Sequence, residues 1–207
     1  MAVRIGVPRE RATGETRVAT VPAVAEKFAA LGAEVLLERG AGALSHVRDE
    51  EYTTVTLVDD PAEVFAADVV LKVDPPTPAE VGLMSRGTVL IGLLQPYTAT
   101  ESVAALRDGG ITGLALELLP RTTRAQSMDA LTSQASIAGY KAGLMAASLA
   151  GRYYPMLMTP AGTLRPAKVV VLGVGVAGLQ AIAMARRLGA MVEAYDVRAV
   201  TAEQVQS

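Results

Sequence analysis

Residues 168–198 read KVVVLGVGVAGLQAIAMARRLGAMVEAYDVR, and this stretch decides the fold. An apolar run from Val169 to Leu172 leads into a glycine-rich turn, and a helical pattern follows until Gly189 ends it. A second apolar run then closes at Asp196. Strand, turn, helix and strand in this order form a βαβ unit, whose two strands lie parallel. The sequence therefore predicts an α/β fold.

The turn carries glycines in the G-x-G-x-x-G spacing, at Gly173, Gly175 and Gly178. In a dinucleotide-binding turn the first permits the tight bend, the second lets a pyrophosphate approach the backbone, and the third lets helix and strand pack closely. We expect the helix to run from Leu179 to Leu188, with its N-terminal amides and positive dipole end facing phosphate groups. The pattern predicts dinucleotide binding, and a purely structural glycine turn is the alternative.

Asp196 follows Gly178 by 18 residues and lies at the carboxyl end of the second strand. An acid at this place accepts hydrogen bonds from the adenosine ribose diol and repels a 2′-phosphate, which favours NAD(H) over NADP(H). Arg198 complicates this preference, because a guanidinium could pair with such a phosphate. The alternative roles of Arg198 are a solvated side chain or a stacking partner for adenine.

The first 120 residues alternate short apolar runs with helical patterns, which is typical of parallel βαβ units. None of the predicted strand-to-helix turns in this part carries a glycine-rich phosphate loop. The sequence predicts five strands, Arg4–Val7, Glu34–Leu37, Val69–Val73, Val89–Leu93 and Gly113–Leu116, with helices over Pro22–Leu31, Ala79–Met84 and Thr100–Asp108.

A polar loop follows Pro120, and after it comes a helix of small residues from Ala130 to Gly151. The segment Tyr153–Lys168 has three prolines and no clear periodicity, so it reads as a connector. We therefore expect an N-terminal Rossmann-like domain over residues 1–130, a linking helix and connector over 131–167, and the start of a second Rossmann-like domain over 168–207. Both domains would be doubly wound parallel sheets, the second truncated after its first βαβ unit.

Composition excludes several classes of protein. The 207 residues hold 19 Lys and Arg against 21 Asp and Glu, and this net charge of −2 argues against a nucleic-acid partner. The absence of cysteine excludes disulfides, a thiolate zinc site and a catalytic thiol, and we expect no metal ion. The N-terminus lacks the apolar run of a secretory signal, which favours the cytoplasmic side. The helix Ala130–Gly151 contains Gln134 and Lys141, so we expect a closely packed soluble helix rather than a membrane span.

The polar loop from Arg121 to Asp129 concentrates arginine, glutamine, serine and aspartate between a predicted strand and a predicted helix. From composition, it could equally be a solvated connector with Asp129 as the helix N-cap. The sequence from Arg121 through RAQSMDALTSQASIAGYKA, however, resembles the nicotinamide-binding loop of proton-translocating NAD(P) transhydrogenases. The stretch GVGVAGLQAIAMARRLGAMVEAYDVR resembles their dinucleotide segment, and TGETRVATVP and VVLKVDPP extend the resemblance over essentially the whole chain.

The resemblance implies roles for individual residues. Arg121, Gln126 and Asp129 would hold and orient the nicotinamide carboxamide and ribose, and we expect them to be the catalytic residues. Thr132 stands where the family usually has serine, which makes its hydroxyl contact with the ligand less certain. The other implied NAD(H) contacts are Ser127 and Met128 of the loop, Val176 over the glycine turn, and Val197 with Asp196 and Arg198 around the adenosine ribose.

The resemblance also implies an activity and partners. Two such protomers pair in the family, and hydride passes directly from NADH to NADP⁺ held by a separate domain, coupled to proton translocation. This chain would be an oxidoreductase component serving NADPH regeneration, peripheral on the cytoplasmic face of the membrane. Its partners would be an NADP(H)-binding domain and a membrane domain.

Alanine dehydrogenase is the nearest alternative, because it shares the fold and both N-terminal motifs. Arg17 and Lys72 match positions that bind the substrate carboxylate there. Oxidative deamination also needs a proton acceptor, for which histidine is suited, but the matching position holds Gln95. The one histidine, His46, lies in a polar stretch and reads as a surface residue. Direct hydride exchange, which needs alignment and the exclusion of water, is the better fit. A nucleotide-binding module without catalysis is the third possibility.

Overall fold

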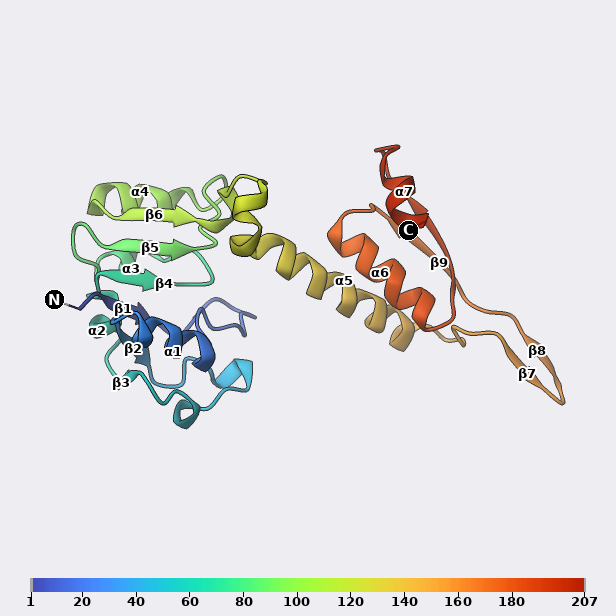
Figure 1. The fold of residues 1–207 in the computed structure, drawn as a ribbon, viewed down its shortest axis with the longest axis horizontal. Coiled ribbons are helices and arrows are strands. Elements are labelled where there is room, and N and C mark those ends of the chain that lie inside the picture. The colour runs from blue at the N-terminus through green and yellow to red at the C-terminus, as the bar shows by residue number, and fades with distance from the viewer. Residues whose placement is uncertain (1, 207) are drawn as a thin grey trace. The chain divides into compact units, whose positions relative to one another are not determined.

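The computed structural model describes residues 2–206, which divide into two compact units, Met1–Met128 and Asp129–Ser207. The first unit is a six-stranded parallel sheet in the order β3-β2-β1-β4-β5-β6 (Figure 1). Because β1 lies inside the sheet and the strand order reverses there, the unit is doubly wound. Its strands are β1 (Arg4–Val7), β2 (Glu34–Glu38), β3 (Thr56–Val58), β4 (Val69–Leu71), β5 (Val89–Gly92) and β6 (Thr112–Ala115).

Helices connect these strands as the parallel arrangement requires. They are α1 (Pro22–Ala30), α2 (Pro61–Phe65), α3 (Pro78–Val81) and α4 (Thr100–Gly109). Three of them begin with proline at the first helical position, where no amide donor is needed. Gly6 of β1 lets α2 approach the sheet, because a Cβ at this position would collide with the carbonyl oxygen of Val64.

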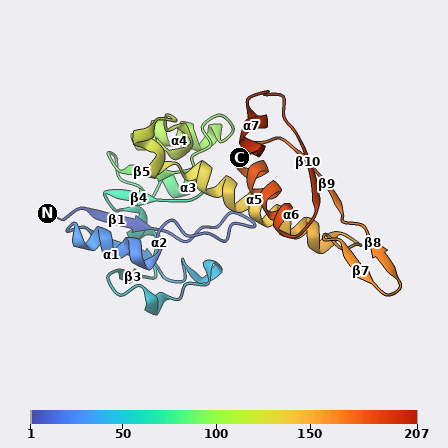
Figure 2. The ribbon, with the colours of Figure 1, turned by 45° about the vertical axis from the view of Figure 1, so that its right-hand side comes forward.

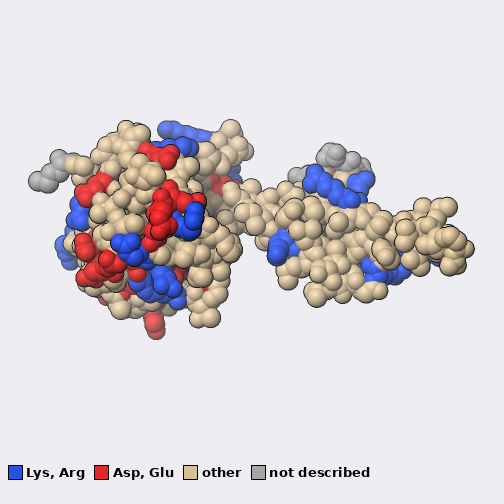
Figure 3. Space-filling view, turned by 90° about the horizontal axis from the view of Figure 1, so that it is seen from below, with Lys and Arg blue, Asp and Glu red and all other residues tan. Residues whose placement is uncertain are grey.

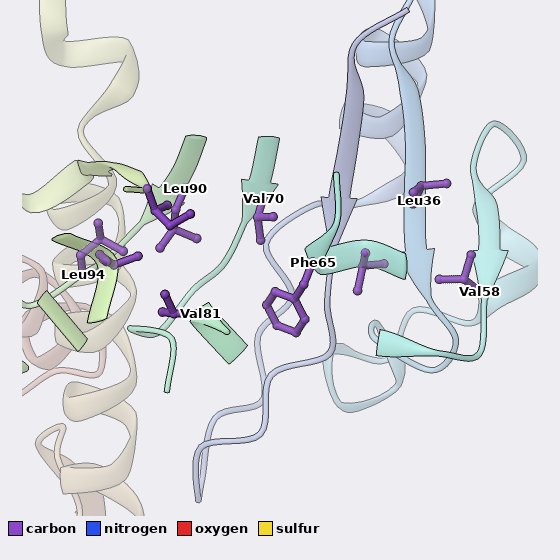
Figure 4. Packing of buried hydrophobic residues seen from close by; sticks show 10 residues of the cluster. Leu36, Val58, Phe65, Val70, Val81, Leu90 and Leu94 are labelled. Atoms are coloured by element: carbon purple, nitrogen blue, oxygen red, sulfur yellow. The ribbon is translucent and has the colours of Figure 1, made fainter. Parts of the chain in front are cut away.

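The core of the first unit lies on both faces of the sheet. Along β2, Val35 and Leu37 belong to one buried cluster and Leu36 to the other, as the alternation of side chains in a strand requires. Figure 4 shows the cluster around Leu36, in which Phe65 and Leu90 are fully buried. Burial of both faces explains why these strands are continuous apolar runs.

The first unit contains one strand more than the five that the sequence predicts. The additional strand β3 and the helix α2 that follows it have three and five residues, which is too short for a period to be recognised. Asp60 caps α2 by accepting a hydrogen bond from the amide of Ala62 at 2.9 Å. The five predicted strands and three predicted helices are present, with ends that differ by one to three residues.

The second unit contains a long helix, a hairpin and one βαβ unit. Its elements are α5 (Ala130–Leu149), β7 (Leu157–Thr159), β8 (Gly162–Leu164), β9 (Lys168–Leu172), α6 (Val176–Arg187), β10 (Met191–Tyr195) and α7 (Thr201–Gln206). Strands β9 and β10 pair in parallel from Lys168 opposite Met191 to Leu172 opposite Tyr195. Helices α5 and α6 lie side by side (Figures 1 and 2).

Two predictions for this unit need correction. Helix α6 begins at Val176 and not at Leu179, so Gly178 lies in its first turn. The segment Tyr153–Lys168, expected to be an irregular connector, contains the antiparallel hairpin β7–β8. Three-residue strands around the turn Pro160-Ala161 are too short to show alternation. Within residues 2–206, no helix combines the length and apolar character needed to cross a bilayer.

Candidate dinucleotide-binding site

Each glycine of the turn between β9 and α6 has its own structural reason. Gly173 has a φ of 93°, a left-handed conformation that favours glycine. A Cβ at Gly178 would collide with the carbonyl oxygen of Gly173, so helix and turn meet only without a side chain. A Cβ at Gly175, in contrast, would meet no heavy atom of the described residues within 4 Å. The backbone at Gly175 therefore borders open space, as the approach of a pyrophosphate requires.

The N-terminus of α6 starts directly at this open backbone. Gly175 is its N-cap residue and has no side chain with which to satisfy the first amides. These unpaired donors and the positive end of the helix dipole suit a phosphate group. Val176 is the first helical residue and is exposed at the turn. The turn thus fits a dinucleotide pyrophosphate by its backbone alone.

Asp196 connects the end of β10 to the glycine turn. Its Oδ2 accepts a hydrogen bond from the backbone amide of Val174 at 2.7 Å, and its Oδ1 accepts one from the amide of Arg198 at 2.8 Å. The Arg198 guanidinium donates from Nε to Oδ1 at 3.0 Å and from Nη2 to Oδ2 at 3.1 Å. Since a carboxylate offers about four acceptor positions, these four donors saturate it.

This pairing sets the charge state of the site. The Arg198 side chain, followed by the two backbone amides, lowers the pKa of Asp196 well below the usual aspartate value. The carboxylate side chain is 7% exposed, whereas Arg198 is 57% exposed. A pocket beside the pair is lined by Val174, Tyr195, Asp196, Arg198 and Thr201, among others. Asp196 is therefore a fixed anion at the rim of a hollow that could take an adenosine ribose, provided that Arg198 shares or releases it.

Asp129 caps helix α5, which is the structural role that composition left open. Its Oδ1 accepts a hydrogen bond from the amide of Thr132 at 2.9 Å, and its Oδ2 accepts one from the Thr132 hydroxyl at 2.6 Å. These two residues are brought together at the start of α5. The cap does not exclude a contact with a ligand, because a carboxylate can accept further hydrogen bonds.

The loop before Asp129 is more regular than its composition suggests. Residues Thr123–Met128 form a 3₁₀ helix in which Ala125 is buried. The other proposed nicotinamide contacts lie on its surface or just before it, and all of them are exposed and belong to the first unit: Arg121, Gln126, Ser127 and Met128. Val197, proposed to flank the adenosine ribose, is also exposed, directly after Asp196.

Sequence reasoning missed a charged cluster at the carboxyl ends of β1 and β4. The Lys72 ammonium lies 3.0 Å from a Glu10 carboxylate oxygen and 3.4 Å from one of Glu80, and its side chain is 2% exposed. Arg17 pairs with Glu15 through Nε at 2.8 Å, and this arginine lowers the pKa of Glu15 to about 2. The two cations that the alanine dehydrogenase alternative would use on a substrate carboxylate thus have carboxylate partners within the chain.

Gln95 lies after the carboxyl end of β5, in a left-handed conformation with a φ of 46°. Its backbone amide donates a hydrogen bond to the Glu117 carboxylate, at the neighbouring end of β6. His46 lies in another part of the unit, exposed at the end of a short 3₁₀ helix, Ala43–Ser45. The position after β5 therefore offers an amide side chain, which does not accept a proton near neutral pH.

Comparisons with known proteins agree with this geometry. Residues 6–138 match the family model described as alanine dehydrogenase/PNT, N-terminal domain, and residues 142–207 match the model of its C-terminal domain. The chain is 48% identical over 213 residues to a protein of Rhodospirillum rubrum, the first of the parts that make up its NAD(P) transhydrogenase subunit alpha, covering 99% of this chain and 56% of that protein. It is 33% identical to alanine dehydrogenase of Bacillus subtilis, covering 94% of this chain and 52% of that protein.

Solved structures show the same similarity. The transhydrogenase from Sinorhizobium meliloti superposes with a TM-score of 0.93 at 45% identity, covering 98% of this chain and 61% of that one. An L-alanine dehydrogenase superposes with a TM-score of 0.84 at 30% identity, covering 99% and 57%. The chain spans about half the length of the curated relatives it matches. By sequence and by fold, it belongs to the alanine dehydrogenase/PNT family.

Proposed function

We propose that this chain is the NAD(H)-binding part of a proton-translocating NAD(P) transhydrogenase. The observation that carries the choice within the family is Gln95, which stands after β5 where an amino-acid dehydrogenase needs a proton acceptor. The higher identity to transhydrogenase subunits than to alanine dehydrogenases supports the same choice. The carboxylate partners of Arg17 and Lys72 support a structural role for those two cations.

In this function the chain's residues act by binding and alignment. The glycine turn and the first amides of α6 hold the pyrophosphate, and Asp196 with Val197 and Arg198 holds the adenosine ribose. Arg121, Gln126 and Asp129 orient the nicotinamide, with Ser127, Met128 and Thr132 beside them. The bound dinucleotide supplies the hydride, so that the protein needs to provide alignment and exclude water rather than a base.

The fixed negative charge of Asp196 supports NAD(H) as the ligand. A 2′-phosphate near this carboxylate would be repelled, and the acid remains ionised because its pKa is lowered. NADP(H) would be bound by a separate domain of the complex, which receives the hydride and regenerates NADPH. A membrane domain would couple the transfer to proton movement, and the present segment would lie peripherally on the cytoplasmic face.

A homodimer is part of this proposal. The second unit exposes apolar side chains on its hairpin, including Met158, which is 74% exposed, and Leu164. Its surface in Figure 3 is mostly uncharged, with a few Lys and Arg groups. Exposed apolar patches of this kind mark contacts with other proteins, and a second copy of the chain would cover them without a further partner.

The test is a comparison of two assays on the complete enzyme. NADH oxidation should proceed when the NADP(H)-binding partner is supplied with NADP⁺. It should not proceed when pyruvate and ammonia are supplied instead. Turnover with pyruvate and ammonia would assign the chain to the amino-acid dehydrogenases, and NADH binding without either reaction would leave a nucleotide-binding module without catalysis.

A further inference from the structure

Helices α5 and α6 approach each other through glycine. Gly139 and Gly143 are the two buried residues of α5. A Cβ at Gly139 would collide with the carbonyl group of Ala177, which is backbone and the second residue of α6. A Cβ at Gly143 would come within 2.8 Å of the Cβ of Met184, a side-chain atom. The contact at Gly139 is therefore the one that brings the two backbones together.

The two helices run in the same direction. Gly139 contacts Ala177 and Gly143 contacts Met184, so both sets of contacts advance along the chain. A hydrogen bond from Nε2 of Gln180 to Oγ of Ser136, at 3.0 Å, joins the same turns of the helices. Packing and hydrogen bonding together fix how far α5 extends past the start of α6.

Each helix starts at a different part of the proposed ligand site. Helix α6 starts at the glycine turn, and α5 starts at Asp129 with its Thr132 contact. Ten residues separate Asp129 from Gly139, which corresponds to about 15 Å along the helix axis. Because Gly139 lies against the first turn of α6, the helix places Asp129 at a set distance beyond the pyrophosphate turn.

We propose that Gly139 is a positioning residue, which holds the nicotinamide end of the site at α5 in register with the pyrophosphate turn at α6. The inference rests on the proposed function, since it assumes that the dinucleotide spans both helix starts. A methyl group at Gly139 must displace the Ala177 backbone, because a carbonyl group, unlike a side chain, cannot rotate away. The glycine turn would then shift relative to Asp129 while each end kept its own shape.

The experiment uses two ligands that differ in how much of the site they occupy. ADP-ribose reaches the adenosine and pyrophosphate positions, and NADH also reaches the nicotinamide position. The complete enzyme is compared with Gly139→Ala and with the control Gly143→Ala, which makes the same chemical change one turn later against the flexible Met184. Binding of both ligands, hydride transfer at saturating NADH and the thermal unfolding midpoint are measured for each.

Gly139→Ala should keep ADP-ribose affinity within about twofold of the unmodified enzyme and lower hydride transfer by about ten- to a hundredfold, as expected for misplacement of about 1 Å. Gly143→Ala should transfer hydride within about twofold of the unmodified rate, because its methyl group meets a movable side chain. If Gly139→Ala does not fold, Gln180→Ala carries the test, since it removes the helix-to-helix hydrogen bond without a steric push. It should slow transfer about two- to tenfold with ADP-ribose binding unchanged.

Unchanged transfer in Gly139→Ala, or in Gln180→Ala where the first variant does not fold, would overturn the inference. So would an equal loss of ADP-ribose binding, NADH binding and thermal stability, which indicates a purely structural glycine. If the unmodified enzyme transfers hydride normally in these experiments, the proposed function stands in either case. Failure of the unmodified enzyme to bind NADH would overturn the proposed function, and this inference with it.

Discussion

Asp196 has two roles that its place in the sequence does not separate. The spacing after the glycine turn predicts a ribose acceptor, and the structure adds hydrogen bonds to Val174 and Arg198 that occupy both carboxylate oxygens. These contacts depend on how the backbone returns after β10, so no residue pattern could have indicated them. Binding of a ribose diol therefore requires Arg198 to give up part of its contact with Asp196.

Asp196→Ala should narrow the preference of the complete enzyme for NADH over NADPH. The substitution removes both the ribose acceptor and the charge that repels a 2′-phosphate, and it leaves Arg198 free to pair with that phosphate. Affinity for NADH should fall, because the Val174 amide loses its partner and the turn loosens. Fluorescence titration with both dinucleotides measures the two affinities. Equal binding of NADH and NADPH by the unmodified enzyme would remove the basis of this prediction.

Glu15 should make the stability of the first unit depend on pH at the acidic end. Arg17 lowers the pKa of Glu15 from 4.5 to about 2, so the unfolded chain binds more protons than the folded chain between these values. The stabilisation is fully present above about pH 4.5 and is lost as the pH falls towards about 2. Glu15→Gln should therefore flatten the dependence of the unfolding free energy on pH in this window, measured by urea titration. An unchanged slope in the variant would show that Glu15 does not carry this linkage.

At the scale of elements, the sequence predicts the long periodic segments well and the short ones poorly. Periodicity and glycine placement predict the βαβ unit from β9 to β10 and the long helix α5, and both are present. Strand β3 and the β7–β8 hairpin have three-residue strands, whose pairing depends on their neighbours rather than on local pattern. The close approach of α5 to α6 could not be predicted either, because a glycine in a helical pattern does not reveal what lies against it.

The start of α5 allows capping and ligand binding to be distinguished. Asp129→Ala should cost about 0.5–2 kcal/mol of stability, because the Thr132 amide loses its acceptor. Asp129→Ser restores a capping oxygen without the charge, and it should recover stability while hydride transfer remains slow. Arg121→Ala, which leaves the cap intact, should also slow transfer with a modest loss of NADH affinity. Thermal unfolding and single-turnover transfer rates are the two measurements.

If Asp129→Ser recovered both stability and transfer, Asp129 would be a cap without a role at the nicotinamide. Normal transfer in both Asp129→Ala and Arg121→Ala would contradict the assignment of this loop to the nicotinamide end of the site.

At the scale of the whole molecule, the two units differ in how completely their sheets are covered. The sheet of the first unit is packed on both faces. In the second unit α6 covers one face of β9 and β10, while the opposite face exposes Val170, Leu172, Met191 and Tyr195, all more than half exposed. An uncovered apolar two-stranded sheet is marginally stable and invites association.

Expressed as these 207 residues, the chain should not form a competent NAD(H) site, although it carries each motif described above. Hydrogen exchange should show strong protection in the first unit and weak protection from Lys168 to Asp196, with little change on adding NADH. Urea titration should then resolve a separate unfolding transition for the first unit. A monodisperse sample that binds NADH tightly and protects β9 and β10 would contradict this prediction.

The most direct test of the proposed function follows the hydride itself. The complete enzyme is given NADH carrying deuterium at the transferred position of C4, together with NADP⁺, and the NADPH formed is analysed by mass spectrometry and NMR. Because the proposed transfer uses no base and relies on alignment of two nicotinamides, the deuterium should appear at C4 of NADPH without dilution by solvent protons. Deuterium lost to solvent, or delivered to pyruvate in the presence of ammonia, would contradict a direct transfer between nicotinamides.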